Sequence, residues 1–491
     1  MATISDMPAE IIIKISHSLT TKELGNLRLT NKRTEAATFQ PFVREFFLKK
    51  QFMITEFSLQ TLIDISEHPH IGPQLSHVVL GLDGYPEGYP VDVLDGGDPS
   101  TDQIDELTTR RSAQRCLMAS GVARDMLAHA FRRLSGLKTV DIRDFSSNTR
   151  DRDRGAWRSY GSVAAQEATG MAMDMRFGVG PNSAIIFPLV IQALASAQRT
   201  GVGIEVVLRS RGEGLPDSAF ALFSFNRDQT LAVVEGLRKL HIDLRLSTND
   251  TIRTPDEASL KDKRTGPFLR TSHLQVFLSH ASGLEWLRVN MRRGDPHQSV
   301  LLLNWIALPR SMPPPVPGHF VAPLKQLDLG DVTARRSLYW NIIRKFKDTL
   351  EAVSIWNSSM EITVAHYEDR IDQWTQLFNQ ITGLPHIKEV TFGRLRVSPD
   401  YPTAGPPLGP YVCFGTTPVE RETHYRGDNA PLFLQQLAAR ARMDWDVLKP
   451  LTHDAAAMDY DEDEEDEEDG MGDESDLQVH ADTDNGLLAD A

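Results

Sequence analysis

Few residues of this 491-residue chain have the types and spacing that chemistry requires. His68 and His70 flank one proline and could bring two imidazoles together. No third metal ligand is indicated nearby, so a loop before a strand is the preferred interpretation. The acidic stretch 465–476 places carboxylates around Gly470 at a spacing that a calcium-binding loop would use. It lacks flanking helices and the usual first and last ligands, so we expect no bound calcium.

The motifs of the common enzyme classes are missing from the sequence. It contains no P-loop, no complete dinucleotide-binding glycine fingerprint, no Gly-x-Ser-x-Gly elbow and no His-Glu-x-x-His motif. Cys116 and Cys413 are the only cysteines, which is too few for a disulfide framework or a Cys₄ zinc site. We therefore expect a protein that is not an enzyme, with no catalytic residue, no cofactor and no metal site.

Charge is concentrated at the C-terminal end. The chain has a net charge of −15, and the segment after Lys449 contains 17 acidic residues and neither lysine nor arginine, so the first 449 residues carry +2. Self-repelling charge with few apolar residues cannot offset the entropy of ordering, which predicts a disordered tail over 450–491. That tail either keeps the chain soluble or docks on a basic protein surface. The nearly neutral body gives no reason to expect direct nucleic-acid binding.

The sequence also lacks the signals of secretion and membrane insertion. The N-terminus has no basic segment followed by an apolar one, as a signal peptide would. The longest apolar stretch, 183–197, contains Pro188 and is shorter than the roughly 20 residues of a membrane span. We expect a protein of the cytoplasm and/or nucleus that does not contact membranes.

The first 50 residues have the pattern of three short helices. We expect these helices to form a binding surface rather than a catalytic site. Pro8 fits the first turn of a helix, Thr20–Glu23 is a capping box that starts a second, and Asn31 precedes a third that ends near Leu48. Isoleucine and leucine recur at helical spacing in the first two helices. Three short helices cannot enclose all these apolar side chains, so a partner should cover part of them.

This segment resembles the F-box motif, whose usual form is Leu-Pro-x-Glu-Ile, spaced Ile and Leu, Asp/Glu-Leu, and then Leu-Arg-x-Val-Asn-Lys/Arg. The matching residues are Met7-Pro8-Ala9-Glu10-Ile11, Ile15, Leu19, Glu23-Leu24, Leu27-Arg28-Leu29 and Asn31-Lys32-Arg33. Two positions depart from the motif: Met7 replaces leucine, and Thr34 stands where an apolar residue is common. Methionine conserves the volume of leucine and should cost little. The alternative is an amphipathic helical cap that closes the next domain.

An F-box implies binding to a Skp-type adaptor and, through it, to a cullin–RING ligase. The resemblance therefore implies a substrate-recognition subunit of an SCF-type (Skp–cullin–F-box) ubiquitin ligase, which holds an unidentified protein target near the ubiquitin-charged enzyme. The residues expected to contact the adaptor are Met7, Pro8, Ile11, Ile15, Leu19, Leu24 and Leu27, with Arg28 at the rim. The alternative is a non-ligase solenoid scaffold that binds basic proteins through its acidic tail.

From 51 to 449 the chain alternates helical stretches with short apolar strands, and this repeating order of elements is typical of stacked repeats. The expected strands are 76–82, 138–143, 204–209, 242–246, 285–291, 325–329, 351–356 and 388–392. The expected helices are 184–198, 230–240, 274–280, 341–347 and 371–382. Several strands share a Leu-x-x-Leu/Val lead-in, as at Leu284–Leu287 and Leu324–Leu327. Because each unit has one helix and one strand in the same order, stacking of the units predicts parallel strands in a solenoid.

The pattern resembles a degenerate leucine-rich repeat that lacks the asparagine or cysteine closing each turn and exceeds the usual period of 20–29 residues. The expected fold class is α/β, with an F-box-like helical domain (1–50), a leucine-rich-repeat-like solenoid (51–449) and the acidic tail (450–491). The combination resembles many fungal F-box proteins; a generic α/β domain is the alternative. Insertions are expected at 83–109 and 145–181, the second being either a solvated loop or a basic recognition loop around Trp157.

Overall fold

The computed structural model describes most of the chain before residue 445. The described residues are 4, 7–86, 100–150, 155–171, 173, 182–209, 214–247, 272–291, 294–309, 319–362, 370–399, 411–415 and 420–444. The chain divides into two units, Met1–Asp444 and Trp445–Ala491, and every described residue belongs to the first. The expected acidic tail and its calcium-loop-like stretch lie outside the described residues.

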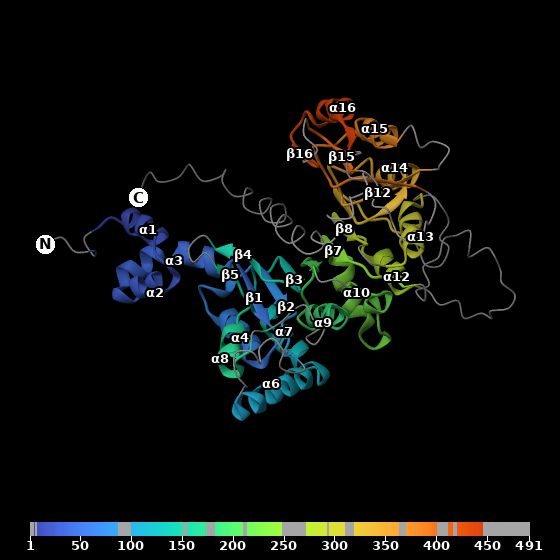
Figure 1. The fold of residues 1–491 in the computed structure, drawn as a ribbon. Helices are drawn as coiled ribbons and strands as arrows, with labels where there is room; N and C mark the ends of the chain where they lie inside the picture. Colours follow the sequence, from blue (N-terminus) through green and yellow to red (C-terminus); the bar gives the residue numbers. More distant parts are fainter. Residues whose placement is uncertain are drawn as a thin grey trace, which may run out of the picture. The chain divides into compact units, whose positions relative to one another are not determined.

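The first unit is a mixed α/β structure (Figure 1). Its helices are α1 (Ala9–His17), α2 (Thr21–Thr30), α3 (Lys32–Phe47), α4 (Glu56–Glu67), α6 (Thr101–Ala119), α7 (Val122–Arg133), α8 (Ser162–Thr169), α9 (Ser183–Ser196), α10 (Arg227–Gly236), α12 (His273–His280), α13 (Pro296–Ala307), α14 (Arg336–Lys345), α15 (Arg370–Ile381) and α16 (Ala430–Arg440), with short 3₁₀ helices η2 (Gly72–Gln74), η3 (Asp217–Phe220) and η4 (Ser224–Asn226). Its strands are β1 (Lys49–Met53), β2 (His77–Gly81), β3 (Thr139–Arg143), β4 (Ser147–Arg150), β5 (Gly155–Trp157), β6 (Gly203–Val207), β7 (Lys239–Asp243), β8 (Trp286–Asn290), β9 (Gln326–Gly330), β10 (Thr333–Arg335), β11 (Ala352–Trp356), β12 (Ser359–Ile362), β13 (Glu389–Gly393), β14 (Arg396–Pro399), β15 (Tyr411–Cys413), β16 (Glu422–Arg426) and β17 (Arg442–Asp444).

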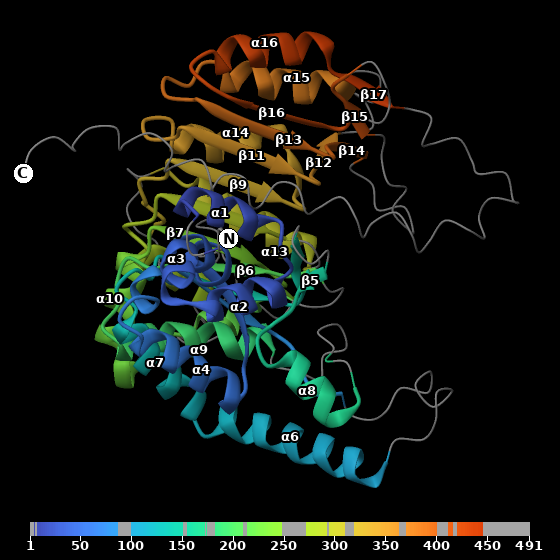
Figure 2. The same cartoon turned by 90° about the vertical axis from the view of Figure 1, so that its left-hand side faces the viewer.

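The largest element is a ten-stranded sheet with the order β1-β2-β3-β6-β7-β8-β9-β11-β13-β16. All neighbouring strands in it are parallel except β16, which runs antiparallel to β13. Strand order follows chain order, so each new unit is added beside the previous one. Figure 2 shows the later strands β9, β11, β13 and β16 side by side. The expected large, mostly parallel α/β sheet is therefore confirmed.

All eight strands expected from the sequence are present in this sheet, but two further strands of the sheet, and the strands of two smaller sheets, were not expected. The missed strands of the large sheet are β1 and β16, which form its two edges. The expected strand 242–246 begins three residues too late, because β7 spans Lys239–Asp243. The expected helix 230–240 runs past the end of α10 at Gly236 and into the first two residues of this strand. Helices α4, α6, α7, α8, α13 and α16 were not among the expected helices.

Alternating residues of the strands point to opposite faces of the sheet, as the pleat requires. One face is apolar: Val140 and Ile142 of β3 lie in register with Ile204 and Val206 of β6, and all four are fully buried. The same pattern continues through Leu240 and Ile242 of the next strand. These residues belong to one continuous hydrophobic core. The other face carries polar and charged side chains at its centre.

Helices pack beside one another in the order in which they follow the strands. Contacts connect α4 to α7, α7 to α9, α9 to α10, and later α13 to α14, α15 and α16 in turn. Their apolar side chains complete the core; Phe187 of α9 meets Phe277 of α12 at 5.8 Å between ring centroids. Within the described ranges, no helix combines the length and apolar character needed to span a bilayer.

A second, five-stranded sheet has the order β10-β12-β14-β15-β17. Its first three strands each follow a strand of the large sheet after a two-residue corner. Asp331, Asn357 and Arg394 occupy equivalent places in these corners with φ of 54°, 46° and 50°. The Asn357 amide donates to Oδ1 of Asp331 at 2.5 Å, so the corners of successive units are bonded to each other.

The two expected insertions are partly built of regular structure. Helix α6 begins at Thr101, inside the first, and strands β4 and β5 and helix α8 lie inside the second. Tyr160 also pairs with edge strand β1: its N–H donates to the Gln51 carbonyl at 2.8 Å, and its carbonyl accepts from the Met53 N–H at 3.2 Å. The second insertion thus covers part of an otherwise open sheet edge. The side chain of Trp157 is outside the described residues.

Candidate functional site

The N-terminal segment folds into three helices whose beginnings are set by the residues expected from the sequence. Pro8 precedes α1, and its carbonyl accepts from the N–H of Ile11 at 3.1 Å. At α2 the Glu23 N–H donates to Thr20 Oγ1 at 3.3 Å, while the Glu23 carboxylate accepts from the Thr20 N–H at 2.9 Å, a complete capping box. Asn31 caps α3 by accepting from the Thr34 N–H at 2.9 Å. The expected helix boundaries are confirmed.

Thr34, which departs from the F-box pattern, is fully buried and satisfied. Its hydroxyl lies 2.8 Å from the Asn31 carbonyl and 3.2 Å from the Leu27 carbonyl, and 3.0 Å from the hydroxyl of Thr30. A hydroxyl with carbonyl partners at the α2–α3 junction avoids the desolvation cost of an unpaired buried group. Threonine at this position is therefore compatible with the packing of the three N-terminal helices.

The eight residues expected to contact an adaptor separate into three groups by exposure. Pro8 and Ile11 are exposed, Met7, Ile15, Leu19 and Arg28 are half-buried, and Leu24 and Leu27 are buried. Leu24 and Leu27 are buried, as are Ile12 of α1 and Val43 of α3, so they support the surface rather than form it. Sequence reasoning left out one exposed apolar residue, Leu29 of α2, which is 86% exposed.

Arg28, expected at the rim, is held by its own unit. Its guanidinium carbon lies 3.5 Å from the centre of the Phe42 ring on α3. Burial lowers the pKa of Arg28, and Glu35 acts in the opposite direction. The side chain remains charged at neutral pH and braces α2 against α3.

The polar face of the large sheet is the second site that could bind another molecule. Neighbouring strands place titratable residues in register on it: Asp141 of β3, Glu205 of β6 and His241 of β7. Lys239 forms an ion pair with Glu205 at 2.7 Å, and its ammonium also lies 3.9 Å from the centre of the Trp286 ring. The face therefore carries both signs of charge.

Two of these groups have perturbed protonation. Burial lowers the pKa of His241 to about 3, so its imidazole is neutral at pH 7. For Glu205, burial acts to raise the pKa, but His241 and Lys239 act to lower it and the net shift is downward. Glu205 is therefore a carboxylate at neutral pH. Among the described residues, His77, Asp141 and Glu205 have ligand atoms close enough to hold a metal ion.

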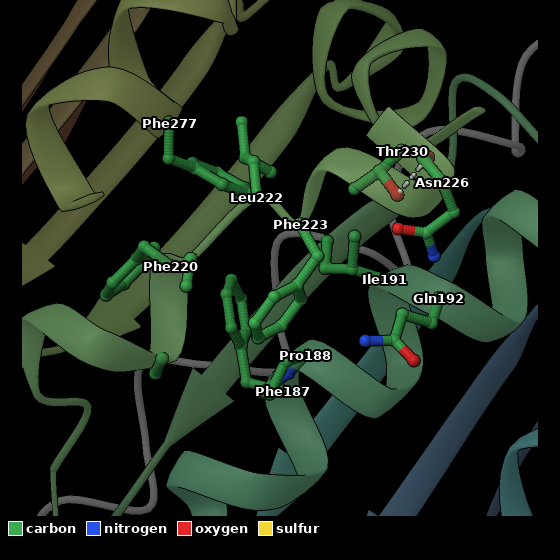
Figure 3. A pocket seen from close by; sticks show the side chains of 12 residues that line it. Phe187, Pro188, Ile191, Gln192, Phe220, Leu222, Phe223, Asn226, Thr230 and Phe277 are labelled. Carbon is green, nitrogen blue, oxygen red and sulfur yellow. Dashed lines mark hydrogen bonds between the residues drawn. The ribbon is translucent and has the colours of Figure 1, made fainter. Parts of the chain in front are cut away.

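A hollow on the helical side of the unit offers little chemistry (Figure 3). It lies between α9, η3, α10 and α12, and its walls include Phe187, Phe220 and Phe277. The only polar side chains among its described lining residues are Gln192, Asn226 and Thr230. Thr230 donates to the Asn226 carbonyl at 3.0 Å. A lining without charged or sulfur-bearing side chains gives the hollow no acid, base or metal ligand.

The His68–His70 pair has a structural role in the turn after α4. Nδ1 of His68 accepts from the backbone N–H groups of His70 and Ile71 at 3.3 and 3.2 Å. Because Nδ1 of His68 already accepts these hydrogen bonds, the contacts favour a structural loop over a metal site at this pair.

Comparison with known proteins adds no relationship to this picture: the chain matches no known protein-family model, and no curated protein is similar to it.

Proposed function

We propose that this protein is the substrate-recognition subunit of an SCF-type ubiquitin ligase, with the N-terminal helices binding a Skp-type adaptor and the body, residues 51–449, holding a protein target. The observation that carries the proposal is the N-terminal unit itself. Its three helices begin beside the capping residues that the sequence marks, and apolar residues of all three are buried. Apolar side chains still remain on its outside.

Those exposed side chains are what a partner would cover. Ile11 is 44% exposed on α1 and Leu29 is 86% exposed on α2, and both helices pack against α3. Burying apolar area contributes roughly 25 cal/mol per Å², and interfaces concentrate their energy in few such residues. Such a subunit needs no catalytic group, since it contributes the proximity and orientation of the target.

The test is capture of a purified Skp-type adaptor by the full chain. Ile11→Glu and Leu29→Glu place a charge on the outside of the unit without touching its core, so both variants should fold. Each should weaken capture by at least about tenfold, the usual effect at an interface anchor. Ile185→Glu is the matched control, because Ile185 is an isoleucine of α9 with similar exposure, 56%. The proposal fails if the unmodified chain captures no adaptor, or if all three variants capture it equally.

The non-ligase scaffold remains the second candidate because of one feature, the 17 acidic residues after Lys449. Charge complementarity would let this segment bind basic proteins, with strong weakening by salt. Truncation after Lys449 should abolish capture on an immobilised lysine-rich polypeptide and leave adaptor capture unchanged. The dependence of each capture on each end of the chain distinguishes the two functions.

A further inference from the structure

We propose that His77, Asp141 and Glu205 form a binding site for a divalent transition-metal ion on the polar face of the large sheet. The three residues come from β2, β3 and β6, which are consecutive neighbours in the sheet. One nitrogen or oxygen atom from each lies within 4.8 Å of the other two. Parallel strands in register bring together residues that are far apart in the sequence. The spacing of these three residues in the sequence therefore does not predict the site.

The second observation is that ligand-type atoms of this cluster are buried without hydrogen-bond partners. They are Nε2 of His77 and Oδ1 of Asp141, and each residue is at least nine-tenths buried. Oε1 of Glu205 is instead paired with the Lys239 ammonium, whose nitrogen lies 2.7 Å away. A buried unpaired polar atom costs about 1–3 kcal/mol, more when charged, and such atoms commonly mark an ion or water. Two such atoms on adjacent strands of one cluster point to a shared occupant.

The geometry suits a small ion. Zinc binds histidine nitrogen and carboxylate oxygen at about 2.0–2.2 Å, which places tetrahedral ligand atoms about 3.3–3.6 Å apart. Nε2 of His77 lies 3.5 Å from Oδ2 of Asp141, the oxygen that Arg143 also binds, and this separation is within that range. The ligand atom of Glu205 lies within 4.8 Å of the other two, so its carboxylate must approach them to complete the set. Three protein ligands leave one coordination position for water or for a group of a bound partner.

The surrounding charges fit an outer shell of such a site. Arg143 binds Oδ2 of Asp141 at 2.5 Å and leaves Oδ1 unpaired. Lys239 pairs with Oε1 of Glu205 at 2.7 Å, and Oε2 of the same carboxylate lies 3.9 Å from Nδ1 of His241. Groups that bond to ligating carboxylates orient them, although two nearby cations also lower the affinity for a positive ion. The imidazole favours a transition metal over magnesium or calcium, which prefer oxygen ligands alone.

The test is binding of Zn²⁺ and Co²⁺ to the full chain after treatment with a chelator. Millimolar Mg²⁺ is present throughout, so that it competes for the carboxylates of the acidic C-terminal segment. We expect about one tightly bound equivalent of Zn²⁺ and, with Co²⁺, the intense visible absorption of a tetrahedral site. His77→Ala and Asp141→Asn should each weaken binding by at least about tenfold. His424→Ala is the matched control on the same sheet, where His424 lies 2.9 Å from the Thr391 hydroxyl.

Two results would overturn the proposal. The first is that the unmodified chain binds no equivalent of Zn²⁺ in the presence of Mg²⁺, which would leave water as the occupant of the cluster. The second is that both ligand variants, folded by circular dichroism, bind Zn²⁺ as tightly as the control. Should a ligand variant misfold, the Co²⁺ spectrum of the unmodified chain decides alone. Adaptor capture plays no part in either readout.

Discussion

The guanidinium of Arg28 stacks on the ring of Phe42, with 3.5 Å between its central carbon and the ring centroid. This contact connects α2 to α3, the two helices that meet at the Asn31 cap. The long side chain of Arg28 therefore has an internal role, joining two of the three N-terminal helices.

We predict that Arg28 and Phe42 are energetically coupled. A double-mutant cycle with Arg28→Ala and Phe42→Leu should give a coupling free energy of unfolding of about 0.5–1 kcal/mol, the usual value for a partly exposed cation–π pair. Urea unfolding of the four proteins measures it. Lys22, exposed on the same helix, is the control when changed to alanine and combined with Phe42→Leu. Additive effects in the Arg28 cycle would show that the stacking contributes nothing.

Asp217 should be a major stabilising residue of the body. Its carboxylate accepts from the Ser272 hydroxyl at 2.6 Å and from the N–H groups of His273 and Leu274 at 3.0 and 2.9 Å. It thereby binds the first turn of α12 from a distant part of the chain. Asp217→Asn removes the charge and places an amide NH₂ donor opposite groups that are themselves donors. The free energy of unfolding should therefore decrease by about 1–3 kcal/mol.

Asp348→Asn is the matched control for that change, since Asp348 is exposed and its substitution should alter stability by less than about 0.5 kcal/mol. Denaturant unfolding compares the two variants with the unmodified chain. Equal stability of both variants would mean that the α12 cap is replaceable.

Asp83 should make stability fall as pH rises. Burial raises the pKa of Asp83 to about 6, although the Ser159 hydroxyl donates to its carboxylate and acts in the opposite direction. A pKa above the unfolded value means that folding favours the protonated form. The stabilisation is complete below about pH 4 and is lost as pH rises through 6. The shift corresponds to a loss on the order of 3 kcal/mol.

Asp83→Asn removes this titration and keeps a neutral side chain of the same shape. The stability of the unmodified chain relative to this variant should therefore decrease between pH 4 and pH 7, as measured by denaturant unfolding across that range. A stability difference that stays constant with pH would contradict the expected protonation of Asp83.

Truncation after Lys449 should leave the melting temperature of the remaining chain almost unchanged. The removed segment carries 17 acidic residues and few apolar ones, so it has little to add to a core. Scanning calorimetry of the full and truncated chains tests this. A large drop in melting temperature would show that the segment packs on the rest.

The sequence alone determined much of this fold because its signals are local. Apolar alternation marked eight strands, since a buried strand shows its own pattern wherever it pairs. The capping box at Thr20 and the asparagine at position 31 marked helix starts, because a cap acts within four residues of itself. The edge strands β1 and β16 were not recognised because both carry charged residues: β1 begins with Lys49 and Lys50, and β16 is bounded by Glu422 and Arg426.

Tertiary structure decided the rest, because the remaining relationships connect residues far apart in the chain. Leu24 and Leu29 lie on one short helix, yet packing against α3 buries the first and leaves the second exposed. His77, Asp141 and Glu205 carry no common motif, and only the register of three parallel strands brings them together. Register depends on how every strand fits its neighbours over the shared core, which no single segment encodes.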